Sequence, residues 1–393
     1  MRSLLASGCA VAVALALTPL SAAPAAAAQR WDVPKSASIT IKGHGYGHGR
    51  GMSQYGAEGA ARQGLGYRQI ASFYYPGTSW GRARGRIRVL LTADTTDDLI
   101  VRARSGLQIR DEGAGTTDAL PDNGATRWRV IRAKGTFRVS FLRQRWRRWR
   151  VLEGRGTFLA GGEPMTLVTP TGDRPYRGRL TAVQPPGSSG LVTVNVLPLE
   201  AYLRGVVPLE IPALWSRAAV RAQAVAARTY AAYERAHPRS AAYDICDTWS
   251  CQVYGGAAAE HPNSDAAIAA TKRRVLQHGG EPAFTQFGSS SGGWTVAGGV
   301  TYLPAKADPY DGWSGNPNHD WKLTVTDRRL ESAFPSLSNL RRIVVVSRDG
   351  NGQWGGRVDR LRLVGSRDRV TVSGDAMRSA LGLKSTWVTF RVR

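Results

Sequence analysis

The chain has 393 residues, and its 53 Lys and Arg side chains outnumber its 29 Asp and Glu side chains, which gives a formal net charge of +24. A chain of this length can bury a sizeable core in two or three domains. The charge favours polyanionic partners, although a solvated, arginine-rich surface explains part of it. The sequence contains no recognisable nucleic-acid-binding motif, and we expect no nucleic acid among its partners.

Residues 1–28 have the composition of a secretory signal peptide. Arg2 is an early positive charge, residues 9–17 form an apolar run, and AAPAAAA at 22–28 offers small-residue cleavage sites. The apolar run is too short to span a bilayer. We therefore expect the protein to be secreted, with cleavage near Ala28.

The region 38–80 contains the most glycine-dense segment, GHGYGHGRGMSQYG at 43–56. Alternate glycines permit positive φ and close backbone approach, so we predict a tight loop. His44 and His48 have the spacing of a helical metal pair, but this density of glycine disfavours a helix and therefore that role. An interrupted helix is predicted next, ending at Pro76 and Gly77.

From Arg86 to about Leu197, short apolar runs alternate with turn residues, which predicts a β-rich region. Within it, RQRWRRWR at 143–150 is compatible with a sugar-binding or polyanion-binding face, a membrane-active stripe, or the solvated face of a strand. Further strands and one helix, AMRSALGL, are predicted near the end of the chain.

The segment 194–236 changes from an apolar strand pattern to an alanine-rich helix pattern over 216–236, for which Ser216 is the expected N-cap. Pro238 ends this helix. Its small side chains let other elements approach closely, so we predict a central, packed helix. The fold class is therefore α+β: a mixed, β-rich core with a central alanine-rich helix and a smaller β-rich lobe.

The turn before this helix carries a carboxylate in apolar surroundings. Glu210 lies between Leu209 and Ile211, with a proline on either side of that tripeptide. Such a carboxylate must be paired or have a raised pKa, and a raised pKa suits a general acid that works near neutral pH. The alternatives are that Glu210 caps the next helix or pairs with an arginine. Glu200 is expected on the preceding strand.

Two further motifs suggest other chemistry. GSSSG at 288–292 formally matches a nucleophile elbow centred on Ser290, but a glycine-rich, β-branched segment follows it instead of a helix, which disfavours a serine hydrolase. We expect these serines to line a cleft. Cys246 and Cys251 are the only cysteines after the leader, and in an exported protein such a pair predicts a disulfide.

Five sequence blocks resemble the stage II sporulation protein D (SpoIID) family, also called the amidase-enhancer (LytB) domain. They are AYLRGVVPLEIPALW at 201–215, AVRAQAVAARTYA at 219–231, CDTWSCQVYGG at 246–256, FGSSSGGWT at 287–295 and GHGYGHGRGMSQYGAEGA at 43–60. The resemblance implies a cell-wall enzyme, a lytic transglycosylase that cuts the MurNAc-GlcNAc bonds of peptidoglycan glycan strands to 1,6-anhydro products. It places the catalytic carboxylate on Glu210.

The resemblance also implies the other site residues. Substrate-binding residues are expected within the matched blocks, at His48, Ser53, Gln54, Arg228, Gln252, Tyr254, Ser290, Ser291 and Gly292. No cofactor is expected, with one alternative: some relatives hold a metal with two cysteines and a histidine, which makes a zinc site of His237, Cys246 and Cys251 the rival to the disulfide.

The net charge, the predicted signal peptide and the resemblance together imply partners, location and domain organisation. Anionic wall polymers and a cell-wall amidase are expected partners in an extracellular, cell-wall location, and the rival function is a non-catalytic wall-binding activator of an N-acetylmuramoyl-L-alanine amidase. We predict that 38–80 packs into the catalytic domain, that 81–190 forms the β-rich lobe and that 191–393 forms the catalytic core.

The order of the blocks differs from the family pattern. In the family the GHG-GMSQYGA block usually comes last, directly after a segment like LGLKST, whereas here LGLKST lies at 381–386 and the block lies at the front. This pattern indicates a circular permutation, which folding tolerates when the original termini lie close together. It predicts that Ser38–Lys42 lies against Trp387–Val392, strand beside strand.

Overall fold

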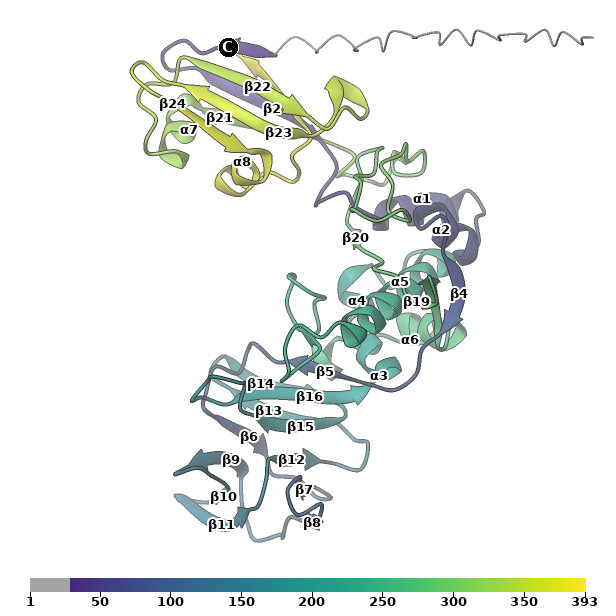
Figure 1. Cartoon of the computed structure of the whole chain (residues 1–393), viewed down its shortest axis with the longest axis vertical. Helices are drawn as coiled ribbons and strands as arrows, with labels where there is room; N and C mark the ends of the chain where they lie inside the picture. The colour runs from purple at the N-terminus through teal and green to yellow at the C-terminus, as the bar shows by residue number, and fades with distance from the viewer. Residues whose placement is uncertain (1–28) are drawn as a thin grey trace, which may run out of the picture.

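A computed structural model describes residues 29–393, so the predicted signal peptide and its cleavage site lie outside the described residues. The molecule is elongated, with a sheet-rich unit at one end, a group of helices in the middle and a β-rich lobe at the other end (Figure 1). Antiparallel sheets and separate helices confirm the α+β class. Among the described residues, none of the helices is both long and apolar enough to cross a membrane.

The sheet-rich unit joins the two ends of the described chain. One sheet has the order β1-β22-β23-β24, and a second has the order β21-β2-β25. Their alternating apolar side chains form a separate hydrophobic core with helices α7 and α8. The elements are β1 (Arg30–Asp32), β2 (Ser38–His44), β21 (Asp320–Thr326), α7 (Asp327–Ala333), β22 (Arg342–Arg348), η2 (Gln353–Gly355), β23 (Val358–Val364), β24 (Arg369–Ser373), α8 (Gly374–Leu381) and β25 (Val388–Val392).

The pairing of β2 with β25 tests the expected neighbourhood of the two chain ends. The strands are antiparallel, with Ile39 opposite Val392 and Gly43 opposite Val388. The prediction that Ser38–Lys42 lies against Trp387–Val392 is therefore confirmed. A circular permutation requires this closeness, and the permutation itself stays a prediction.

The β-rich lobe consists of two sheets. Their orders are β11-β10-β9-β6-β13-β14 and β17-β5-β16-β15-β12-β7-β8. Apolar side chains from both sheets belong to one core. The strands are β5 (Arg86–Leu90), β6 (Asp98–Arg102), β7 (Gln108–Asp111), β8 (Thr117–Ala119), β9 (Arg127–Ala133), β10 (Thr136–Leu142), β11 (Trp146–Leu152), β12 (Gly156–Leu159), β13 (Met165–Thr169), β14 (Gly172–Tyr176), β15 (Arg179–Val183), β16 (Val192–Pro198) and β17 (Ile245–Cys246).

The helical middle surrounds α5 (Arg217–Ala236), the predicted alanine-rich helix. Small side chains leave room on several of its faces, and it contacts α1, α2, α3, α6 and β18. The remaining elements here are β3 (Met52–Ser53), α1 (Gln54–Arg62), α2 (Tyr67–Tyr74), β4 (Ser79–Arg82), α3 (Leu199–Arg204), α4 (Val207–Glu210), η1 (Gly256–Ala259), α6 (Pro262–Ala270), β18 (Arg274–His278), β19 (Glu281–Pro282) and β20 (Phe287–Gly288).

The described residues contain two large hydrophobic cores. The core around α5 is continuous with that of the β-rich lobe, and it includes side chains from Met52 to Leu303. The apolar side chains of 320–393 pack instead with β1 and β2. The predicted unit 191–393 is therefore shared between two cores.

Candidate active site

Glu210 is the last residue of α4, a single helical turn between α3 and α5. Val206 and Val207 are buried and anchor this turn in the core. The helix cannot continue because Pro212 disfavours helical dihedrals for Ile211, which is extended at φ −132° and ψ 138°. The apolar residues fix the backbone, and the carboxylate projects from the end of the turn.

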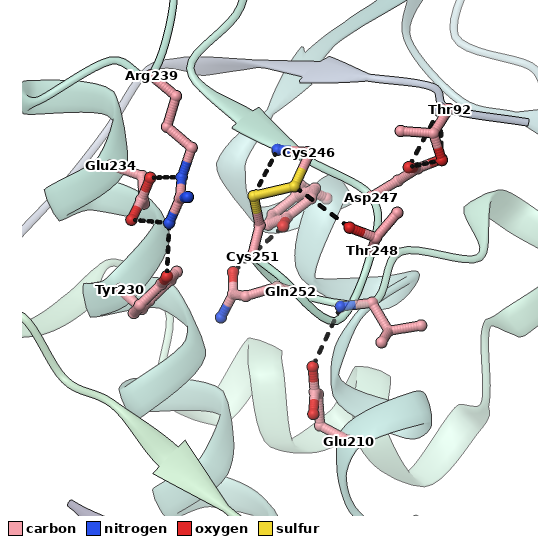
Figure 2. The surroundings of a disulfide bond; sticks show 12 residues. Thr92, Glu210, Tyr230, Glu234, Arg239, Cys246, Asp247, Thr248, Cys251 and Gln252 are labelled. Carbon is pink, nitrogen blue, oxygen red and sulfur yellow. Dashed lines mark hydrogen bonds and ion pairs between the residues drawn. A yellow bond between two sulfur atoms is a disulfide. The ribbon is translucent and has the colours of Figure 1, made fainter. Parts of the chain in front are cut away.

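The Glu210 carboxylate has few polar partners. Its Oε1 accepts a hydrogen bond from the Val253 N–H at 3.2 Å, and the Gln54 side chain also donates to it. Burial raises the pKa of Glu210 to about 7, and these two hydrogen bonds oppose that rise. Figure 2 shows the carboxylate directed at the loop that follows the disulfide.

The alternative roles for Glu210 belong to other acids. The carboxylate at the start of α5 is that of Glu58, which accepts from the Ser216 N–H at 2.8 Å. Among residues 29–393, no cation contributes to the pKa of Glu210. The acid that pairs with a buried arginine is Glu200, which lies on α3 and not, as predicted, on the preceding strand.

A pocket of about 230 Å³ adjoins Glu210. Its most exposed aromatic side chain is that of Trp249, which is 87% accessible. An exposed indole beside a carboxyl group offers an apolar face against which a sugar ring can stack. The lining residues are His48, Glu210, Tyr230, Trp249, Ser250, Cys251, Val253, Gln286 and Phe287.

His48 reaches this pocket from the glycine-rich loop. Its Nδ1 accepts a hydrogen bond from the Arg50 N–H at 2.9 Å. Burial, followed by the charges of Arg50, Arg357 and Arg378, lowers the pKa of His48 to about 4. The ring is therefore neutral at pH 7, and because Nδ1 accepts, its proton is on Nε2. His48 therefore lines the pocket as a neutral ring, and a hydrogen bond to the Phe287 backbone opposes the lowering of its pKa.

The cysteine pair forms a disulfide, as the first of the two sequence interpretations predicted. The sulfurs of Cys246 and Cys251 are bonded, with 5.5 Å between the Cα atoms. Both sulfurs are therefore unavailable as thiolate ligands, and the alternative zinc site is wrong for this structure. His237, its third expected ligand, instead stacks on Tyr233 with the ring centroids 4.3 Å apart.

Arg228 has a structural role and does not contact the pocket. Its side chain is fully buried, and it donates two hydrogen bonds to Glu200 at 2.9 and 3.0 Å. A guanidinium without surface exposure cannot reach a glycan, so the prediction that Arg228 binds substrate is wrong. The pair ties α5 to α3, the helix that precedes the Glu210 turn.

Gln252 and Tyr254 are also buried. Gln252 accepts from the Tyr202 hydroxyl, and the Tyr254 hydroxyl donates to Asn195 at 2.8 Å. Their side chains are 1% and 4% exposed, so the prediction that they contact substrate directly is wrong. They flank Val253, whose backbone N–H donates to Glu210.

Three of the expected cleft residues bind one buried carboxylate instead. The hydroxyls of Ser53 and Ser290 donate to Asp311 at 2.6 and 2.8 Å, and the Gly292 N–H donates at 3.0 Å. Ser291 is similarly buried and donates through its hydroxyl to Asp308. The prediction that these residues bind substrate is therefore corrected: they join the GSSSG block to the N-terminus of α1.

The residues that sequence reasoning missed fall into two groups. Asp311 and its hydrogen-bonding partner His319, 2.9 Å apart, lie in no quoted block, and the sequence shows no pattern that singles them out. Trp249 does lie within the CDTWSC block, but its exposure depends on the disulfide-closed loop. The tryptophan and tyrosine of the CDTWSCQVYGG block were the sequence features that could have pointed to Trp249.

Comparison with known proteins matches the part of the chain that contains Glu210. A family model described as SpoIID, stage II sporulation protein, matches residues 187–278, which include Glu210, α5 and the disulfide. The chain contains a SpoIID domain. Residues outside this range, His48, Gln286 and Phe287, complete the lining of the pocket beside Glu210.

Curated relatives match a similar part of the chain. The "Amidase enhancer" of Bacillus subtilis is 37% identical over 142 residues, which is 35% of this chain and 18% of the relative. "Stage II sporulation protein D" of the same organism is 31% identical over 146 residues, which is 30% of this chain and 41% of the relative. The matches thus span less than half of these relatives. No solved structure matches the chain.

Proposed function

We propose that this protein is a lytic transglycosylase that cleaves the glycan strands of peptidoglycan, with Glu210 as its single acid and base. The observation that carries the proposal is a partly buried carboxyl group with a pKa of about 7 at the edge of a pocket. A group with this pKa is present in both protonation states near neutral pH, as an acid that must also act as a base requires.

The reaction needs two proton transfers and no water. Protonated Glu210 donates its proton to the glycosidic oxygen while the bond from that oxygen to the anomeric carbon of the muramic residue breaks. The C6 hydroxyl of the same residue then attacks the anomeric carbon, and ionised Glu210 takes up the hydroxyl proton. A 1,6-anhydro ring forms, and Glu210 returns to its protonated state.

The lining of the pocket supports a mechanism with one carboxyl group. Glu210 is the only carboxylic acid among the described residues that line it. Hydrolysing glycosidases use two carboxyl groups, one of which activates water or forms a covalent intermediate. The exposed Trp249 supplies a stacking face, and neutral His48 lines the same pocket.

A protein that cleaves peptidoglycan must act outside the cytoplasm, in the cell wall. The predicted signal peptide, the disulfide and the names of the relatives support an exported protein that acts in the cell wall. The relative named "Amidase enhancer" supports an amidase as a functional partner, and it also motivates the rival proposal of a non-catalytic activator.

The deciding experiment is the mass analysis of products released from purified peptidoglycan sacculi. The wild type should release 1,6-anhydro-muropeptides, and Glu210→Gln should reduce the release rate by at least about 10²–10⁴-fold because glutamine transfers no proton. Glu281→Gln, the same change at an exposed position, is the matched control and should keep the wild-type rate.

The same assay separates the two functions. If the wild type releases no anhydro products but stimulates an added amidase, and Glu210→Gln stimulates it equally, the protein is an activator and the catalytic proposal fails. Equal glycan binding by wild type and Glu210→Gln would show that the variant lost chemistry and not binding.

A further inference from the structure

The β9-β10-β11 meander carries an unusually one-sided charge. Residues 123–152 contain ten basic side chains and no acidic side chain. The meander forms one edge of the six-stranded sheet and lies at the end of the β-rich lobe, away from α4 (Figure 1). This segment contains the RQRWRRWR motif, which the proposed catalytic function does not use.

The strand register places several of these cations on one face. Trp128, Val130 and Val139 point into the core, so their sequence neighbours point outward. On that outer face Arg127 lies opposite Leu142, and Arg129 lies opposite Ser140, which in turn lies opposite Arg148.

The outward row also includes Arg138 on β10 and Arg102 on β6, which is paired with Arg127 in the ladder. Strand geometry separates such neighbours by roughly 5–10 Å. We call the outer face formed by Arg127, Arg129, Arg138 and Arg148 the arginine face. It presents a regular array of positive charge instead of a single anion pocket.

Few of these charges are neutralised within the protein. Of the ten cations in 123–152, only Arg129 and Arg150 lie within 4.0 Å of an acidic side chain in residues 29–393. The partner of Arg129 is Asp98, at 3.8 Å. An array of like charges destabilises the protein that carries it unless a counter-charge covers it, which points to an extended anionic partner.

The aromatic side chains of the meander narrow the kind of partner. Trp146 is covered by Arg129, whose guanidinium lies 4.2 Å from the ring centroid, and Trp149 packs edge-on against buried Trp128. Nucleic-acid strands bind such surfaces by stacking bases on open aromatic rings, and membranes bind by inserting them. Neither ring is free to do so, whereas Arg127, Arg138 and Arg148 have no acidic side chain within 4.0 Å in residues 29–393.

We propose that the arginine face binds a linear, base-free polyanion, namely a polymer of polyols joined by phosphodiester links. Phosphate oxygens accept paired hydrogen bonds from guanidinium groups, and a flexible polymer can place successive phosphates over successive arginines. The site is distinct from the Glu210 pocket, and the proposal does not depend on the catalytic one. It gives the protein a means of attachment separate from its reacting site.

The test uses the protein from residue 29 onward and a fluorescent synthetic oligomer of glycerol joined by phosphodiesters. The wild type should bind it with an affinity that falls as salt rises. In the double variant Arg127→Gln with Arg148→Gln, affinity should fall, and the slope of log affinity against log salt should decrease by roughly two, one for each lost phosphate contact.

The control is Arg367→Gln with Arg369→Gln, which removes the same charge from exposed positions on the other end of the molecule. It should keep the wild-type slope. Equal losses in both double variants would reduce the effect to net charge and overturn the proposal, as would tighter binding to single-stranded DNA of equal charge or to phosphatidylglycerol vesicles. Circular dichroism of all variants excludes misfolding as the cause.

Discussion

Glu210 and Asp311 are both carboxylates removed from water, and their surroundings give them opposite properties. Glu210 accepts one backbone hydrogen bond, from Val253, and one from the Gln54 side chain, and burial raises its pKa to about 7. Asp311 is fully buried, and its pKa is nevertheless lowered, chiefly because its hydrogen bonds to His319 and to two serine hydroxyls outweigh the cost of burial. The number of donors decides the difference.

This contrast separates a reactive group from a structural one. Asp311 collects donors from two distant segments, through Ser53 and Ser290, and from nearby Asn316, and so fixes the glycine-rich loop against the GSSSG block. Glu210 is left with spare lone pairs that face a pocket. A carboxyl group that acts as a general acid needs oxygens that are free to contact substrate. A carboxylate with many hydrogen-bond donors has a lowered pKa and therefore has no proton to give near neutral pH.

The largest effect is expected from changing Asp311, the carboxylate with many hydrogen-bond donors. Asp311→Asn replaces one carboxylate oxygen by an amide NH2 group, which would face N–H and O–H donors instead of accepting from them. The change also removes the negative charge beside His319. The free energy of unfolding should fall by about 3–5 kcal/mol. Asp320→Asn is the control, because that side chain is 73% exposed and its pair with His44 should be worth less than about 1 kcal/mol. Similar losses in both variants, measured by urea unfolding, would contradict the structural role of Asp311.

Glu210, the carboxylate with few hydrogen-bond donors, should govern how activity depends on pH. Since Glu210 must be protonated to donate, kcat/KM for anhydro-product release should be level below pH 7 and fall about tenfold per pH unit above it. His48, with a pKa of about 4, stays neutral over this range, so His48→Gln should keep the same alkaline limb whatever its effect on the rate. Activity that rises through pH 7 would contradict Glu210 as the initial proton donor.

The features predicted from sequence were those that depend on local pattern. Proline, alanine periodicity and the apolar neighbours of Glu210 are properties of short segments, and they predicted α5 and its terminating residues. The cysteine pairing followed from spacing and export alone. The adjacency of β2 and β25 is a long-range contact, and it was predictable only because a family pattern was broken at that point.

The errors arose where a side chain's direction depends on distant residues. The serines of GSSSG were assigned to a cleft because the acceptor that binds them, Asp311, lies about twenty residues later in an irregular segment. Arg228 was assigned to substrate because it lies in a family block, whereas its partner is Glu200 on α3. Polar residues in family blocks show that a position matters, but burial decides whether it binds substrate or supports the site.

The disulfide affects the Glu210 side of this comparison, because its loop precedes Val253, the one backbone donor to Glu210. Replacing both cysteines by serine opens a loop with a sequence separation of 5 residues, and the free energy of unfolding should fall by about 2 kcal/mol. The Val253 hydrogen bond lowers the pKa of Glu210. A looser loop weakens this bond and so raises that pKa, and the alkaline limb of activity should move to higher pH. Ser250→Ala, within the same loop, should leave both quantities unchanged. A limb that does not move would show that other contacts hold Val253 in place.

The smallest effect concerns stability, and its sign follows from the raised pKa. Folding raises the pKa of Glu210 from 4.5 to about 7, so the folded protein binds this proton more tightly than the unfolded chain does. The favourable contribution is complete below pH 4.5 and is lost as the pH rises to about 7, above which the buried charge is unfavourable. Glu210→Gln carries no such charge, so relative to wild type its free energy of unfolding should gain about 1–2 kcal/mol between pH 5 and 8, after allowance for partial exposure. Urea unfolding at both pH values measures this gain, and Glu281→Gln at the exposed position should show none. A Glu210→Gln curve parallel to that of wild type would mean that the carboxylate is solvated, and the contrast with Asp311 would then lose its basis.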